Sequence, residues 1–174
     1  MYNRLVCCVI VAVVAIVAVN AIDLSALNAI PTAYAQQQQQ KFMAKLAGKD
    51  EVPPKNTTAT GTIELELTPD GRVSPYILNL TNINNVTLAH IHQGEKGTNG
   101  PILVTLYQSV NATGQINGTL SSGKIFSNKF EGPLAGKYIS DLIKLINEGK
   151  VYVNVHTKQN PQGEIRGQLA VVKS

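Results

Sequence analysis

The sequence predicts a mainly β protein, an antiparallel β-sandwich or barrel with one short helix near residues 140–148. Short runs of Val, Ile, Leu and Thr recur along the chain and are separated by Gly, Pro and Asn. In residues 60–68 the side chains of Ile63, Leu65 and Leu67 alternate with polar ones, which is the period of a strand with one buried face. The period becomes helical only between residues 140 and 149. These patterns favour a fold built mainly from short strands.

The first 35 residues have the layout of a secretory signal peptide. Arg4 precedes an unbroken apolar run over residues 5–19, and the small-x-small sequence of residues 33–35 comes directly before Gln36. We expect cleavage after Ala35, with an uncleaved N-terminal anchor as the alternative. Residues 36–41 are a glutamine-rich linker, and residues 42–172 form the folded domain. Both cysteines lie in the leader, so the exported domain has no thiolate chemistry and no disulfide.

The strands follow one another with turn residues between them. They are expected over residues 42–47, 60–68, 72–80, 86–92, 102–107, 115–120, 124–130, 151–156 and 164–172. The turn at residues 69–71, Pro-Asp-Gly, predicts a hairpin between the second and third strands. In the helix, Ser140 can cap the first turn, and Gly149 ends the last.

The charge pattern excludes nucleic acid as a partner. Lys and Arg together number 15 against 11 Asp and Glu, and the two signs are interleaved with no basic stripe. The glycine-rich segment 94–101 lacks the spacing of a phosphate-binding loop, so no nucleotide or organic cofactor is indicated. The chain contains no serine nucleophile motif and no paired-carboxylate motif, so no residue is assigned a catalytic role.

All three histidines fall in two of the expected strands. His90 and His92 form an H-x-H pair, and alternate residues of a strand share a face. In residues 151–156 the valines would occupy the core face, which places Tyr152, Asn154 and His156 together on the opposite one. Three neutral imidazoles suit Zn²⁺ or Cu²⁺. The alternative is that these are ordinary hydrogen-bonded histidines, and the periodicity does not settle which way His90 and His92 point.

Two carboxylates follow these strands and could support a metal site. Glu95 comes after the histidine pair and Glu164 after the last turn, and each is a candidate ligand or hydrogen-bond partner of a ligand. The alternative is that both are solvated charges.

The chain also contains an excess of N-x-S/T triplets, which are acceptors for N-linked glycans. They begin at Asn56, Asn79, Asn85, Asn111 and Asn117. A glycosylated, exposed protein would explain them, and so would an Asn- and Thr-rich β protein in which such triplets arise freely.

Three blocks of residues carry a recognisable pattern. The first runs from Phe42 through Glu51, Pro53 and Pro54; the second is Ala-His-Ile-His from residue 89, followed by Gly94, Gly97 and Gly100; the third holds Asn154, Asn160, Pro161, Gly163, Arg166 and Gln168. In order and separation they resemble the CHRD (chordin-type) domain family over residues 42–170. This resemblance implies an extracellular β-sandwich in which the residues of these blocks serve the fold.

The H-x-H strand followed by a glycine-rich loop is also distantly similar to the copper/zinc superoxide dismutase sandwich. Either an immunoglobulin-like or a superoxide-dismutase-like arrangement is therefore expected. A binuclear centre of the dismutase type needs six histidines and an aspartate, and this chain has three histidines. A complete dismutase site is excluded, although a mononuclear site is not.

We therefore expect a secreted or cell-surface module that binds copper or zinc through His90, His92 and His156. One alternative is a metal-free structural or adhesive envelope module, in which Glu164 and Arg166 form an ion pair and Glu51 binds loop amides. Another is a mononuclear copper redox enzyme. The expected partners are a metal ion and envelope or extracellular proteins or glycans, with a membrane contacted only through the N-terminal segment.

Overall fold

A computed structural model describes residues 40–67, 73–112 and 114–172. The expected leader and the Pro-Asp-Gly turn at residues 69–71 lie outside these ranges. Within them, none of the helices has the length and apolar character needed to cross a bilayer.

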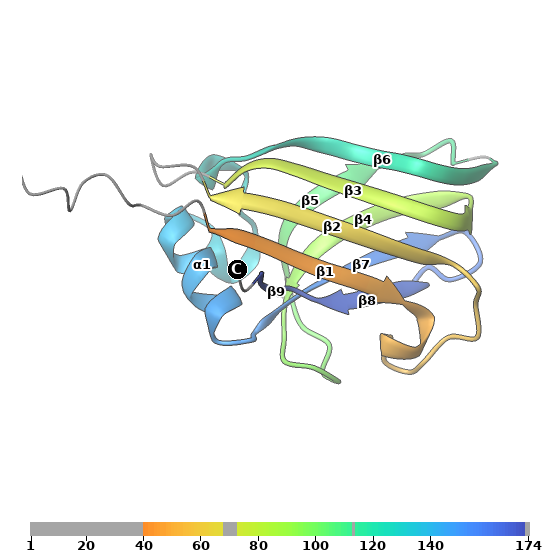
Figure 1. Ribbon diagram of the computed structural model, residues 1–174, viewed down its shortest axis with the longest axis horizontal. Coiled ribbons are helices and arrows are strands. Elements are labelled where there is room, and N and C mark those ends of the chain that lie inside the picture. Colours follow the sequence, from red (N-terminus) through yellow and green to blue (C-terminus); the bar gives the residue numbers. More distant parts are fainter. Residues whose placement is uncertain (1–39, 68–72, 113, 173–174) are drawn as a thin grey trace, which may run out of the picture. The chain divides into compact units, whose positions relative to one another are not determined.

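The described chain is mainly β, as predicted, and its strands pair antiparallel (Figure 1). The strands are β1 (Lys41–Ala47), β2 (Thr60–Leu67), β3 (Val73–Asn84), β4 (Val86–Gln93), β5 (Ile102–Gln108), β6 (Gln115–Ile125), β7 (Val151–Thr157), β8 (Ile165–Gln168) and β9 (Ala170–Val171). Their order in the sheet is β5-β4-β7-β8-β1-β2-β3-β6, and β9 pairs with β1. Short 3-10 turns occupy Gly48–Asp50, Ser127–Lys129 and Gly132–Leu134.

The sheet curls so that its two edge strands, β5 and β6, approach one another. In Figure 1, β1, β2, β3 and β6 lie in the nearer layer and β4 and β5 pass behind them. The Leu106 carbonyl of β5 accepts hydrogen bonds from the Tyr76 hydroxyl (3.1 Å) and the Ser121 hydroxyl (2.9 Å). Side chains therefore bridge the seam, and the sheet is a nearly closed barrel around one apolar core.

The edge of β5 is also occupied by Glu131. Its backbone N–H donates to the Leu103 carbonyl (2.9 Å), and its carboxylate accepts from the backbone N–H (3.0 Å) and hydroxyl (2.8 Å) of Thr105. Backbone groups that a neighbouring strand would otherwise satisfy are thus satisfied by one residue of the following loop.

The alternation read from the sequence sets the core. Ile63 and Leu65 of β2 are buried, and so are their register partners on β1, Ala44 and Phe42, while Glu64 is exposed. This agrees with the alternation expected for residues 60–68.

Strand β7 differs from the others because both of its faces are buried. Every residue from Val151 to Thr157 is shielded from solvent. Val151, Val153 and Val155 belong to the core, as expected. The opposite face carries polar residues and is covered by loops, which makes it the place where a buried polar site can form.

The helix α1 (Ile139–Asn147) forms where it was expected, but Ser140 does not cap it. The N-cap is Tyr138, and the Asp141 carboxylate accepts a hydrogen bond from the Tyr138 backbone N–H (2.9 Å). A carboxylate in the first turn satisfies a free N–H group and favours the helix dipole, and so performs the capping function. Gly149 follows the helix as predicted.

Two strand assignments near the C-terminal half were wrong. Residues 115–125 form one continuous strand, and the segment after Ile125 turns into a 3-10 helix where a strand over residues 124–130 was expected. The last strand, expected over residues 164–172, is divided at Leu169, whose buried side chain separates β8 from β9. The pairing of β6 with β3 continues to Ile125 through three register shifts.

Gly167 offers a test of how closely β8 approaches β1. A methyl group at this position would overlap the Lys45 backbone carbonyl. We expect Gly167→Ala to lower the free energy of unfolding by about 2 kcal/mol or more, because backbone atoms must shift to relieve the overlap. Urea unfolding measures the change. The exposed β6 variant Ser122→Ala should stay within about 0.5 kcal/mol of wild type, and an equally mild effect of Gly167→Ala would contradict the close approach.

Candidate metal centre

The polar face of the sheet brings side chains from three adjacent strands together. Across β4 and β7, His90 pairs with Asn154 and His92 with Tyr152, while Leu88 pairs with His156. Across β7 and β8, Asn154 pairs with Arg166. His90 and His92 therefore lie on the same side of the sheet as His156, opposite the core residues Ala89 and Ile91.

The three histidines form one buried cluster. Their exposed fractions are 5% for His90 and 8% for both His92 and His156. Nδ1 of His90 lies 3.1 Å from Nε2 of His156, and one nitrogen from each ring lies within 4.8 Å of the others. The residues that the sequence singled out from two separate strands are thus in contact.

Backbone carbonyls fix the tautomers of two of the rings. His92 Nδ1 donates to the Gly100 carbonyl (2.9 Å), and His156 Nδ1 donates to the Pro161 carbonyl (3.0 Å). In a neutral imidazole the other nitrogen then carries the lone pair. Both Nε2 atoms are consequently acceptors, which is how protein metal ligands are usually held.

The arrangement fits a small transition-metal ion. Two nitrogens bound to one ion at about 2.0–2.1 Å stand roughly 2.9–3.4 Å apart, depending on the angle. The separation of 3.1 Å between His90 Nδ1 and His156 Nε2 falls in that range. The Nε2 atom of His92 is buried and has no hydrogen-bond partner. An ion bound by three imidazoles would use this lone pair, which is costly to bury unpaired.

The cluster keeps its imidazoles neutral. The pKa of His90 is lowered to about 4, mainly by burial and also by His156 and His92, with Glu131 opposing the shift. Burial also lowers the pKa of His92 and of His156, against the carbonyls of Gly100 and Pro161, which favour the charged rings. Neutral imidazole is the form that binds a metal.

A stack of three side chains supports His92. Its ring lies parallel to the Tyr152 ring at 4.9 Å, and the Arg166 guanidinium covers the other face of Tyr152 at 3.4 Å. The Tyr152 hydroxyl accepts a hydrogen bond from the Gly100 backbone N–H (3.2 Å). Gly100, whose carbonyl orients His92, is therefore held in place by Tyr152, whose ring stacks on His92.

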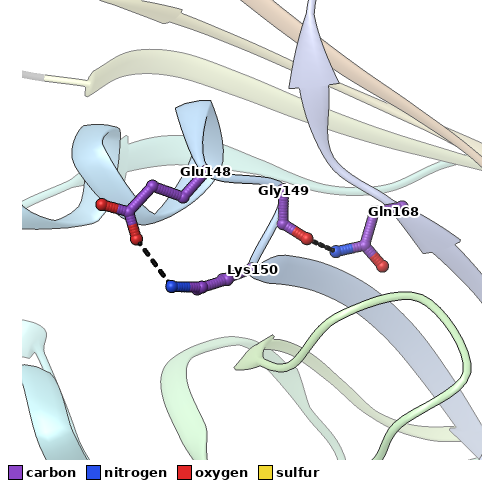
Figure 2. A network of polar contacts seen from close by, with 4 residues as sticks. All are labelled: Glu148, Gly149, Lys150 and Gln168. Carbon is purple, nitrogen blue, oxygen red and sulfur yellow. Dashed lines mark hydrogen bonds and ion pairs between the residues drawn. The ribbon is translucent and has the colours of Figure 1, made fainter.

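Arg166 holds the glycine-rich loop over this stack. Its side chain is 2% exposed and donates to the Asn99 amide oxygen (3.0 Å) and to the carbonyls of Glu95 (3.1 Å) and Thr98 (2.7 Å). Gln168, two residues further along β8, donates to the Gly94 carbonyl (3.0 Å) and to the Gly149 carbonyl (2.6 Å), the contact drawn in Figure 2. One short strand thus anchors both the loop that covers the histidines and the end of α1.

The two carboxylates considered as supporting groups lie elsewhere in the network. Glu164 accepts hydrogen bonds from the hydroxyls of Thr57 (2.8 Å) and Thr157 (2.6 Å) and from the Asn160 amide (3.2 Å). Glu164 stabilises the turn at residues 160–163, which supplies the Pro161 carbonyl to His156. Its three hydrogen-bond donors do not include Arg166, with which an ion pair was considered. Glu95 contributes its backbone carbonyl to Arg166.

Glu51 is buried beneath that same turn. Its side chain is 5% exposed, its Oε1 has no hydrogen-bond partner, and burial raises its pKa to about 7 although Arg166 opposes the shift. A Cβ on Gly163, which has φ 128, would come within 2.5 Å of Oε1. Glycine is therefore favoured at residue 163 both by the positive φ and by the space that the Glu51 carboxyl group occupies.

The segment that follows Glu51 contacts the glycine-rich loop. The Val52 carbonyl, directly before Pro53 and Pro54, accepts a hydrogen bond from the Asn99 side chain (2.9 Å).

The glycan acceptor candidates lie away from the histidines. Asn56 and Asn111 are exposed on loops, whereas the amide oxygens of Asn79, Asn85 and Asn117 accept hydrogen bonds from Thr119, Gly114 and Asn82. Thr113 of the Asn111 triplet is outside the described residues.

Sequence reasoning missed Glu131 as a neighbour of the site. It binds Thr105, which pairs with His90 across β4 and β5, and its charge favours protonated His90. No local motif marked it, because it lies in a loop far from the histidines in sequence. The sequence gives one weak signal that the carbonyls of Gly100 and Pro161 accept hydrogen bonds from His92 and His156: both residues lie in turn segments rich in Gly and Pro.

Comparison with known families gives one match. The model of the CHRD domain matches residues 42–169. No curated protein and no solved structure matches the chain.

The buried Glu51 predicts an unusual pH dependence. Since its pKa is raised from 4.5 to about 7, its contribution to stability is present at low pH and is lost as the pH rises through that interval. At pH 8 we expect Glu51→Gln to be about 2 kcal/mol more stable than wild type, with the difference disappearing near pH 4.5. Urea unfolding across this range measures it. The exposed β2 variant Glu64→Gln is the matched control, and a gain for Glu51→Gln that does not change with pH would contradict the assignment.

Proposed function

The chain belongs to the CHRD domain family, and we propose that it is an exported module that holds one copper or zinc ion between His90, His92 and His156. The apolar run and small-x-small sequence at its N-terminus support export. The observation that carries the metal proposal is the buried cluster of three neutral imidazoles, two of which are oriented by backbone carbonyls.

The donor set supports copper or zinc over other ions. Imidazole nitrogen suits both of these metals, whereas magnesium, calcium and manganese favour carboxylate, carbonyl and water oxygens. Both cysteines precede the described residues, and the cluster consists of the three histidines. When bound, the ion would be held by nitrogen donors, and the chain's own residues would orient the rings, keep them neutral and exclude water.

The cluster also supports a binding role over a hydrolytic or redox role. No carboxylate hydrogen-bonds to the three rings among the described contacts, and the nearest buried acids, Glu51 and Glu164, contact the turn at residues 160–163 instead. A general acid or base must lie within hydrogen-bond reach of the reacting group. A metal-binding module is therefore the function that this geometry supports best.

Metal content tests this function directly. The full-length chain, exposed to one copper or zinc salt and dialysed, should retain about one equivalent of ion, since three buried imidazoles bind with high affinity. His90→Ala and His156→Ala should each retain less than about a tenth of an equivalent. Elemental analysis gives the stoichiometry, and circular dichroism confirms that the variants are folded. The exposed β5 variant Gln108→Ala is the control and should bind like wild type. Less than a tenth of an equivalent in metal-replete wild type would refute the function.

The lowered histidine pKa values predict that bound metal resists acid. Protons compete with the ion only when the pH approaches the pKa of the ligands, and burial holds all three below 6.5, His90 at about 4. We expect constant occupancy from pH 8 to about pH 6, with release between about pH 5 and pH 4. Metal content after dialysis at each pH measures it. Half-release at pH 6.5 or above would show that the rings titrate as exposed histidines do.

A further inference from the structure

Asn154 is a buried polar residue of the same face as the histidine cluster. It is on β7 between Tyr152 and His156, on the same face as both, and its register partner on β4 is His90. Side chains paired in this way are about 5 Å apart at Cβ, and diagonal neighbours such as His92 are within reach. The Asn154 side chain is 4% exposed, and its amide oxygen has no hydrogen-bond partner.

An unpartnered amide oxygen at this depth calls for a donor or a cation. A buried acceptor without a partner costs roughly 1–3 kcal/mol. The oxygen lies close enough to His92 to favour that ring's protonated form. Yet His92 Nδ1 donates to the Gly100 carbonyl, so its Nε2 is also an acceptor, and it too is without a partner. Two neighbouring buried acceptors are stabilised when a positive charge lies between them.

Other oxygens around the cluster are already engaged. The Tyr152 hydroxyl accepts from the Gly100 backbone, and the Glu164 carboxylate accepts three hydrogen bonds. Glu51 Oε1 also lacks a hydrogen-bond partner, but it lies beneath the turn at Gly163. Among the described buried side-chain atoms that lack a partner, two of the three are His92 Nε2 and Asn154 Oδ1, and both belong to this face.

We propose that the amide oxygen of Asn154 is the fourth protein ligand of the metal, which makes the site an N₃O centre. The inference rests on the proposed function of the three-histidine cluster and deepens it. Amide and backbone oxygens serve as weak additional ligands beside imidazoles in some copper sites. Because four protein atoms fill the coordination of a four-coordinate ion, no position is left for an exogenous ligand. The site then stores the ion or stabilises the fold, since metal catalysis requires an exchangeable position.

Cobalt(II) substitution tests whether the coordination is filled. The probe is Co(II) added to the metal-free full-length chain, followed by a titration with azide, which binds to exchangeable positions. Four-coordinate Co(II) absorbs visible light more strongly than five- or six-coordinate Co(II). We expect the wild-type spectrum to have the intense four-coordinate band and to be unaffected by azide. In Asn154→Ala we expect metal affinity about tenfold or more weaker and a spectrum that shifts on adding azide. Asn79→Ala, an exposed asparagine of β3, is the control and should match wild type.

A second variant keeps the test decisive if Asn154→Ala does not fold. Asn154→Asp replaces the neutral ligand with a charged one, so Co(II) should raise its Tm by more than it raises that of wild type. The inference is overturned if wild type binds azide as readily as Asn154→Ala, or if the shift in Tm for Asn154→Asp is no larger than for wild type. Failure of wild type to bind any Co(II), copper or zinc would instead overturn the proposed function itself.

Discussion

The burial of β7 on both faces is the constraint that the rest of the site depends on. Its valine face meets the apolar core, and its other face must be covered although it carries Tyr152, Asn154 and His156. Each polar atom there needs a partner from the covering loops, because buried polar groups without one are costly. The loop over residues 94–100 and the turn over residues 160–163 each supply a backbone carbonyl, to His92 Nδ1 and His156 Nδ1 respectively, and Arg166 and Glu164 hold the two segments in place.

The same arrangement explains why the cluster consists of neutral groups. A carboxylate beside the rings would raise their pKa values and keep them protonated, whereas burial, mutual repulsion and Arg166 act in the opposite direction. Buried acids are present but are displaced to the turn, where Glu164 is satisfied by three donors and Glu51 carries a raised pKa. The buried acids are thus held apart from the imidazoles, at the turn over residues 160–163.

Much of the fold and the three residues of the histidine cluster could be predicted because their signals are local. The alternation in β2 predicted which residues are buried, the alternation in β7 predicted which residues share a face, and the H-x-H spacing placed two rings on one face. The direction of His90 and His92 could not be predicted, because Val86 and Leu88 share their spacing and β4 shifts register against β7 between Val86 and Leu88. The carbonyls that bind His92 and His156 could not be predicted, because every residue has a backbone carbonyl and the sequence does not mark which one is used. Glu131 could not be predicted either, because it lies in a loop that contacts β5 only in the folded chain. Ser140 was expected to cap the helix, but the helix begins one residue before it, at Ile139, and the Asp141 carboxylate accepts the hydrogen bond at the N-terminus.

The contacts that close the barrel affect how copies of the molecule meet. An edge strand with free N–H and C=O groups is a template on which another chain can add a strand. Along β5, Glu131 hydrogen-bonds to the Leu103 carbonyl and the Thr105 backbone N–H. The hydroxyls of Tyr76 and Ser121 donate to the Leu106 carbonyl. These groups therefore offer no ladder to a second molecule, even at high local concentration. The seam is thus protected against intermolecular sheet extension at these residues of β5.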